Sequence, residues 1–139
     1  MDSVKSVTRK VTVQLVVART CTLPLRLDLR YEPTDPYVVR AAFSTDTDEL
    51  AEWTLGRDLL ADGLTTTAGH GNIRIRPTTG HGDQTTYIAL GPPADTALLE
   101  VPTQDIKAFL DDTQTLVPQG TESAHIDWEH ELTNLLTTG

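Results

Sequence analysis

Two Gly-His-Gly triplets, centred on His70 and His81, are the residues of this chain that come closest to a ligand-site pattern. Between them lies the short alternating segment Asn72–Pro77, which is typical of a β-strand. Such a strand spans roughly 17 Å, so the two imidazole rings would stand at its opposite ends. A metal or ligand site is the alternative, but we favour turn residues, with glycine supplying positive φ at both ends of an exposed strand.

The other residue types that could do chemistry have no supporting pattern. His125 and His130 are five residues apart, and the chain has no HExxH, CxxC, Walker, GxGxxG or GxSxG motif. The only cysteine, Cys21, has no neighbouring base, so we expect a quiet or buried thiol rather than a nucleophile. The acids of residues 46–49 lack the spacing and the glycine of a calcium loop. We therefore predict no catalytic residue, no metal site and no cofactor.

Five charged residues are candidates for contact with a partner: Arg40, Arg74, Arg76, Asp111 and Asp112. Arg74 and Arg76 alternate with isoleucines, so they share the outer face of one strand, and Arg40 takes a similar outward position on an earlier strand. Charge on an exposed strand keeps it soluble, which is the ordinary explanation, and a surface for a carboxylate-bearing partner is the alternative. Asp111 and Asp112 lie near a helix end, where the dipole disfavours acids, and fit a solvated face better than a basic partner.

Composition limits the classes of partner. The chain has 139 residues with 20 Asp and Glu against 11 Lys and Arg, a formal net charge of -9. This balance disfavours nucleic acid and anionic membranes, whose binders gain affinity by neutralising phosphate. No apolar run approaches about 18 residues, so any membrane link would pass through a partner. The length fits one domain over residues 1–139, with residues 1–10 expected to be flexible, and a single cysteine suits a reducing cytoplasm.

The elements that must position these residues are strands followed by helices. Apolar alternation predicts six or seven antiparallel strands, at 11–17, 23–31, 37–43, 50–55, 72–77, 85–91 and 97–101. The inward positions on these strands are predicted to include Val17, Leu23, Tyr37 and Trp53. Pro24 is expected at a strand start or on a sheet edge, because it cannot donate a hydrogen bond to a neighbouring strand.

Helical periodicity marks three further segments. A short helix is expected over 56–64 with Gly63 as its left-handed cap, and a second helix over 102–113 with Thr103 as its N-cap. A third is predicted over 127–136. The fold class is therefore α+β: antiparallel sheets or a barrel-like sheet, with a short mid-chain helix and two C-terminal helices packed on one side.

Two segments resemble a known family. LRYEPTDPYVVRAAF (29–43) and EWTLGRDLLADGL (52–64) resemble the L-R-Y-x-x-x-D-P-Y-x-V-x-x-x-F and E-W-x-x-x-R-D-L-L-x-x-G segments of the SsgA-like proteins of sporulating actinobacteria. Residues 71–77 are similar to that family's G-D-V-R-V-W-P strand, with Asn72 in place of Asp and Arg76 in place of Trp. The resemblance covers nearly the whole chain after the first ten residues, and its overall look is nearest to the SsgB type.

The resemblance implies a cytoplasmic, non-enzymatic regulator of cell division that marks septum sites during sporulation and helps to recruit the tubulin-like protein FtsZ. Implied partners are FtsZ, other SsgA-like proteins and a membrane-bound division helper. The implied fold is α+β and similar to the whirly single-stranded-nucleic-acid-binding proteins, assembled as a homotrimer. That similarity supplies the alternative function, single-stranded nucleic-acid binding, which the net charge and the few aromatic residues disfavour.

Overall fold

The computed structural model describes residues 6–78 and 84–126, and in this part of the chain eight antiparallel strands form one sheet. Across the sheet they lie in the order β4-β3-β2-β1-β8-β7-β6-β5. Their bounds are β1 (Val7–Ala18), β2 (Cys21–Tyr31), β3 (Val38–Ser44), β4 (Glu49–Gly56), β5 (Ala68–His70), β6 (Ile73–Pro77), β7 (Thr85–Leu90) and β8 (Ala97–Pro102). The helices are α1 (Arg57–Asp62), α2 (Thr103–Leu116) and the 3-10 turn η1 (Glu122–His125). The prediction of an α+β fold built on antiparallel strands is confirmed.

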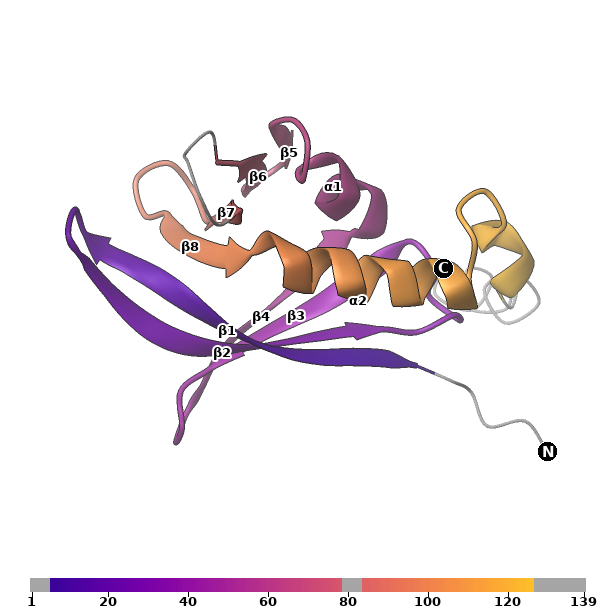
Figure 1. The fold of residues 1–139 in the computed structure, drawn as a ribbon, viewed down its shortest axis with the longest axis horizontal. Helices are drawn as coiled ribbons and strands as arrows, with labels where there is room; N and C mark the ends of the chain where they lie inside the picture. The colour runs from indigo at the N-terminus through magenta and orange to yellow at the C-terminus, as the bar shows by residue number, and fades with distance from the viewer. Residues whose placement is uncertain (1–5, 79–83, 127–139) are drawn as a thin grey trace, which may run out of the picture.

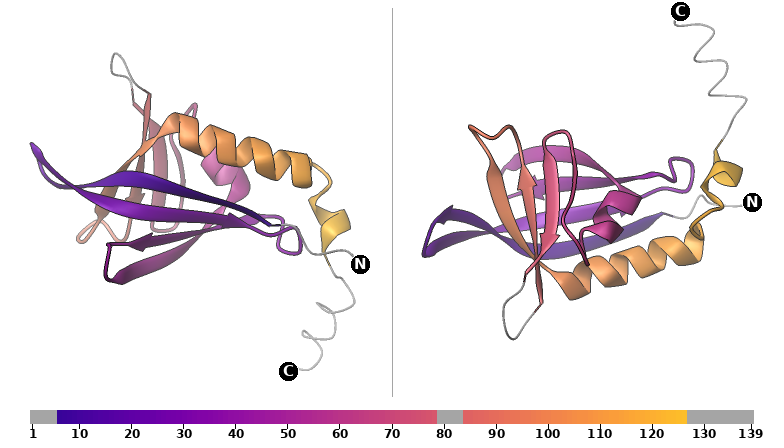
Figure 2. Two further views of the ribbon diagram at one scale, coloured as in Figure 1. Left: turned by 60° about the horizontal axis from the view of Figure 1, so that its bottom comes forward. Right: turned by 90° about the horizontal axis from the view of Figure 1, so that it is seen from above.

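The sheet curls into a half-barrel, and both α-helices lie on its inner side (Figure 1, Figure 2). α1 follows β4 without a break and also contacts β5, so it spans the gap between the two edge strands. α2 packs against β1 and β8, and its own residues Ile106 and Phe109 are fully buried. The helices therefore cover the apolar inner face of the sheet and leave its outer face to solvent.

Period-two alternation decides which side of each strand meets the core. In β2 the inner side chains Leu25, Leu27, Leu29 and Tyr31 are buried, whereas Arg26 and Arg30 between them are exposed. The same rule holds in β6, where Ile73 and Ile75 are buried and both arginines are exposed, as the sequence predicts.

A short contact between β1 and β8 joins the two halves of the sheet. Only Gln14–Val16 pair with β8, whereas β1 pairs with β2 along nearly its whole length. Beyond this contact α2 packs along β1, and the Arg9 guanidinium donates to Asp105 of α2 at 2.8 Å. Residues 7–10, predicted to belong to a flexible segment, lie in β1 and pair with residues 28–31 of β2.

The far end of the β1–β2 hairpin departs from the predicted burial. Val17 and Leu23 are 48% and 50% exposed, because the hairpin extends past the last paired residues of both β3 and β8 (Figure 1). Pro24 lies in this extension and pairs only with β1, so its position on a sheet edge is confirmed. Tyr37, also predicted to face inward, is 48% exposed because it precedes β3, and Trp53 is half-buried against the core.

The predicted loop before residue 72 contains the edge strand β5. Its three residues pair with β6 through a tight turn at Gly71, whose φ of +60° is the positive value that the sequence predicts for that glycine. A strand of only three residues is too short for its alternation to stand out from a loop. The second Gly-His-Gly triplet, around His81, and the predicted helix over 127–136 lie outside the described residues.

Two predicted helix caps are wrong. α2 begins at Thr103, directly after Pro102, and the Thr103 hydroxyl bonds the buried Thr86 hydroxyl at 2.8 Å instead of capping the helix. Gly63 ends α1 with φ -66°, not in the left-handed region. A Cβ atom at Gly63 would lie 2.2 Å from Ile75 Cγ2, so glycine is needed for close approach of α1 to β6.

The buried side chain of Arg57 connects α1 to the segment that follows α2. It is 1% exposed, and its Nη1 donates to the carbonyl oxygens of Val117 at 2.8 Å and Thr113 at 3.3 Å. Its Nη2 donates to Glu122 Oε2 at 2.9 Å, and the guanidinium lies 5.1 Å from the centre of the Tyr31 ring. A cation at these carbonyls supplies donors that the last turn of a helix lacks. Arg57 thus ties four separate elements together.

The partners of Arg57 are themselves held by further hydrogen bonds. Glu122 Oε1 accepts from the backbone N–H of Gly120 at 2.7 Å, and the Tyr31 hydroxyl donates to the carbonyl of Pro36 at 2.9 Å. The pKa of Glu122 lies below its usual value, first because its own backbone N–H bonds the carboxylate and then because Arg57 does. Burial raises the pKa of Tyr31, so this hydroxyl stays a donor.

We expect Arg57→Met to destabilise the protein by about 3–5 kcal/mol, because breaking a buried ion pair leaves the Glu122 carboxylate without its cation and the Val117 carbonyl oxygen without the donor described above. Urea unfolding of the full chain followed by fluorescence measures the change. Arg40→Met, which removes an exposed arginine, is the matched control and should shift stability by less than about 0.5 kcal/mol. Equal effects of the two substitutions would contradict the structural role of Arg57.

Glu122→Gln should reduce stability at neutral pH, and the difference from wild type should shrink in acid. The folded pKa of Glu122 is lowered from 4.5, so its contribution is full above that unfolded value and disappears as pH falls through the folded value. Urea midpoints between neutral pH and pH about 3 test the trend. Glu52→Gln, at an exposed glutamate of β4, controls for loss of a carboxylate. A difference that stays constant with pH would refute the assignment.

Gly63→Ala should cost about 1–3 kcal/mol through overpacking, because the added methyl group overlaps Ile75. The φ of Gly63 is one that alanine adopts freely, so the cost is steric. Gly56→Ala is the comparison, since a Cβ there meets nothing nearer than 3.5 Å. Thermal unfolding of both variants decides the matter, and a Gly63→Ala protein as stable as Gly56→Ala would show that Ile75 yields easily.

Candidate partner-binding surface

The outer face of β1, β2 and β3 gathers four exposed basic residues, Lys10, Arg26, Arg30 and Arg40, which we call the basic face. Alternation turns each of these side chains away from the core, since their sequence neighbours on β2 and β3 face inward. Strand register then brings them together: Arg30 stands directly opposite Arg40. A chain of net charge -9 thus carries four of its 11 basic residues on the outer face of three adjacent strands.

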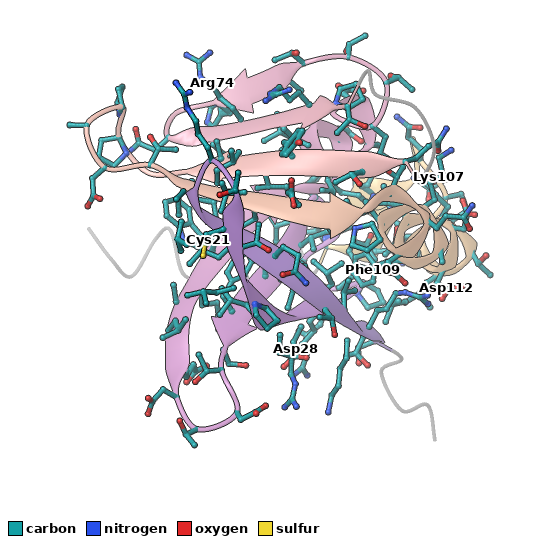
Figure 3. The ribbon with its side chains drawn as sticks, turned by 60° about the vertical axis from the view of Figure 1, so that its left-hand side comes forward. Cys21, Asp28, Arg74, Lys107, Phe109 and Asp112 are labelled. Atoms are coloured by element: carbon teal, nitrogen blue, oxygen red, sulfur yellow. The ribbon has the colours of Figure 1, made fainter. Side chains whose placement is uncertain are left out.

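Asp28 lies within the basic face, opposite Lys10 in the β1–β2 register. Its Oδ1 atom is buried, and among the described residues no hydrogen-bond donor reaches it. Figure 3 places Asp28 on the outer side of β2, with Phe109 between the sheet and α2 on the inner side. A carboxylate oxygen that is shielded and unpartnered can accept a hydrogen bond from a bound molecule.

Two open hollows mark the ends of the basic face. One of about 260 Å³ is lined by Thr8, Lys10, Asp28 and Arg30, together with Arg9 and Leu29. The other, of about 310 Å³, lies where β3 leaves β2, and its polar lining includes Thr12, Arg26, Ser44 and Asp46. Both are open depressions on a sheet, suited to a chain laid across them rather than to an enclosed small molecule.

The structure places Arg40 apart from Arg74 and Arg76, the other two arginines that are predicted as partner contacts. Arg40 lies on β3, whereas Arg74 and Arg76 lie on β6, with β2, β1, β8 and β7 in between. The guanidinium of Arg76 stacks over the Tyr87 ring at 4.5 Å, and Arg74 lies far from Asp28 in Figure 3. Arg40 therefore belongs to the basic face, and the β6 pair lies apart from it.

Asp111 and Asp112 are exposed on α2, away from both groups of arginines. Figure 3 draws Asp112 and Lys107 at the outer edge of α2, both directed to solvent. The five charged residues that the sequence predicts as partner contacts thus lie on three separate elements, β3, β6 and α2. Whether the β6 pair or these acids touch a partner stays a prediction.

The residues considered for chemistry do not converge. Over residues 6–78 and 84–126, no group of three or more His, Cys, Asp or Glu side chains is placed to hold a metal ion. His70 ends β5, and His125 ends η1, far along the chain from it. Cys21 is exposed at the end of the β1–β2 hairpin, so the thiol is not buried.

Sequence reasoning missed Lys10, Arg26 and Arg30 as members of a surface. The outward orientation of Arg26 and Arg30 follows from the alternation in LPLRLDLRY, whereas Lys10 lies in the segment that is expected to be flexible. The missing signal was register: pairing residues 26–30 against 40–44 places Arg30 beside Arg40. Antiparallel pairing of neighbouring strands would have found it, but the turn between them does not fix a register on its own.

A family model described as "Streptomyces sporulation and cell division protein, SsgA" matches residues 25–122. Among curated proteins, the sporulation-specific cell division protein SsgB of Streptomyces coelicolor is 43% identical over 124 residues, covering 89% of this chain and 90% of that protein. SsgB of Frankia casuarinae is 38% identical over 134 residues, covering 96% and 94%.

Solved structures agree with these sequence matches. An SsgA-like sporulation-specific cell division protein from Thermobifida fusca superposes with a TM-score of 0.86 at 35% identity, covering 96% of this chain and 98% of that one. A structure from work on SsgB in sporulating Streptomyces coelicolor gives 0.83 at 40% identity, covering 91% and 99%. The curled antiparallel sheet with its inner helices is therefore the fold of a class of actinobacterial sporulation proteins.

The chain belongs to the SsgA family of sporulation and cell-division proteins. The resemblance seen in the sequence is confirmed, and the named relatives are of the SsgB type. None of the helices that the structure describes is long and apolar enough to cross a membrane.

Proposed function

We propose that this protein is a non-enzymatic, sporulation-specific regulator of cell division that marks septum sites and helps to recruit FtsZ. The observation that carries the proposal is the match, over about nine tenths of both chains, to proteins named sporulation-specific cell division protein SsgB. The surface chemistry fits a binding role, because the described residues offer exposed charge and no convergent set of catalytic groups.

The protein would act in the cytoplasm at division septa. Its partners would be FtsZ, other SsgA-like proteins and a membrane-bound division helper, which would supply the link to the membrane. A homotrimer would present three copies of one surface to a filament with repeated sites. Contacts that are weak one at a time then gain avidity, so clustering would follow polymerisation.

Single-stranded nucleic-acid binding remains the alternative, on the expectation of a whirly-like fold. The basic face is the surface that would serve it, yet its residues on β1–β3 include no aromatic side chain on which bases could stack. The net charge of -9 also opposes it. We therefore rank protein binding first.

The test is co-sedimentation of the full chain with FtsZ from the same organism, polymerised with GTP, across a concentration series. We expect saturable pelleting that disappears when GDP replaces GTP, because recruitment to a polymer depends on repeated sites. A variant that no longer forms the oligomer should pellet more weakly than wild type.

Absence of pelleting at any concentration would contradict direct recruitment. Pelleting of the monomeric variant as tight as that of wild type would contradict the avidity mechanism but leave recruitment intact. A labelled oligothymidylate titrated in parallel reports on the alternative, and binding tighter than to the polymer would favour it.

A further inference from the structure

We propose that the basic face, Lys10, Arg26, Arg30 and Arg40, holds an extended, carboxylate-rich segment of the protein partner. The inference rests on the proposed function, since it assigns a chemistry to the FtsZ segment that would be bound. It goes beyond that function by naming the surface and the kind of peptide that fits it.

Like charges lie side by side on the basic face. Arg30 and Arg40 stand directly opposite each other on neighbouring strands, about 5 Å apart, where like charges are destabilising. Glu32 and Asp35 line a small hollow together with both arginines, and Glu32 bonds Arg30 at 2.9 Å. Within the part of the chain that the structure describes, however, neither Arg26 nor Arg40 forms an ion pair. A carboxylate placed between the two guanidinium groups would relieve the repulsion and accept charge-assisted hydrogen bonds from both.

Spacing along the strands supports a peptide rather than a single small anion. Arg26 and Arg30 are four residues apart on β2, about 13 Å, and Lys10 lies between them on β1. Carboxylates at alternate positions of an extended peptide recur about every 7 Å, so two or three of them match this spacing. The hollows of about 260 and 310 Å³ lie at the two ends of the same path.

Asp28 decides between kinds of anionic partner. Its unpartnered Oδ1 needs a donor, and a peptide backbone carries an N–H at nearly every residue beside its acidic side chains. A DNA sugar-phosphate backbone, by contrast, carries acceptor oxygens and no N–H donor for Asp28. With no aromatic platform beside it either, the face suits an acidic protein segment best.

The overall charge of the molecule makes the basic face selective. With 20 acids against 11 bases, most of the surface repels an acidic segment, while this face attracts it. Repulsion elsewhere and attraction here orient the partner, and the interaction should weaken as salt rises.

The experiment compares two variants with the same loss of charge, R30Q/R40Q on the basic face and R74Q/R76Q on β6. All four arginines are exposed, so both variants should keep the fold, which thermal unfolding checks. Each is titrated with a fluorescein-labelled peptide of alternating glutamate and serine and then tested for pelleting with FtsZ polymer. We expect R30Q/R40Q to weaken peptide binding roughly tenfold and to reduce pelleting, because each exposed ion pair contributes up to about fivefold. R74Q/R76Q should behave as wild type.

A larger effect of R74Q/R76Q, or equal effects of the two variants, would overturn the assignment to the basic face. The assignment would also be overturned if the wild-type protein bound labelled oligothymidylate or phosphatidylglycerol vesicles more tightly than it binds the peptide. If wild type pellets with FtsZ and R30Q/R40Q pellets equally well, this inference fails while the proposed function stands. If wild type binds the peptide but never pellets, the proposed function fails and the acidic-segment site remains.

Discussion

The buried guanidinium of Arg57 is the interaction on which the rest of the structure depends. Desolvating a charge is costly, and the cost is offset only because two carbonyl oxygens, the Glu122 carboxylate and the Tyr31 ring surround it. Those partners come from β2, from the end of α2 and from η1, so the ion fixes where the chain goes after α2. Removing any one of these partners would leave part of the desolvation cost of the buried groups without compensation. This contact fixes the end of α2, and the Arg9–Asp105 ion pair and the apolar packing on β1 and β8 hold the rest of the helix over the inner face.

Covering the inner face with helices has a consequence for the outer one. Because α1 and α2 bury the apolar side of the sheet, the side chains of the opposite parity are free to carry charge. On β1–β3 that freedom is used for lysine and arginine in a chain with a large excess of acids. Arg30 beside Arg40 is a local arrangement that folding alone does not favour, and such departures are expected where a surface serves binding.

Much of this architecture could be predicted from the sequence, and the rest fails for identifiable reasons. Alternation located seven of the eight described strands and the inward sets of β2 and β6, because a half-buried strand forces period two. It missed β5, which is too short to alternate, and it overextended burial to Val17 and Leu23, since no local pattern says where neighbouring strands stop. Gly63 and Thr103 are of residue types expected at caps, yet tertiary contacts with Ile75 and Thr86 determine them. Alternation predicts that Arg40 faces outward. That Arg30 lies beside it, however, depends on the register of β2 against β3, which no local pattern fixes.

The three-residue contact between β1 and β8 carries a consequence for the order of folding. The strand order shows two meanders, β1 to β4 and β5 to β8, in which every pairing joins strands adjacent in sequence. Only β1 with β8 pairs segments from distant parts of the chain, and with three residue pairs this register is as short as that of β5 with β6. Each meander can form from local contacts at low entropic cost, whereas their union must close a long loop for a few hydrogen bonds. The half-barrel is therefore built from two locally paired meanders that meet along one short strand pair, with α2 and the Arg57 contact as further links between them.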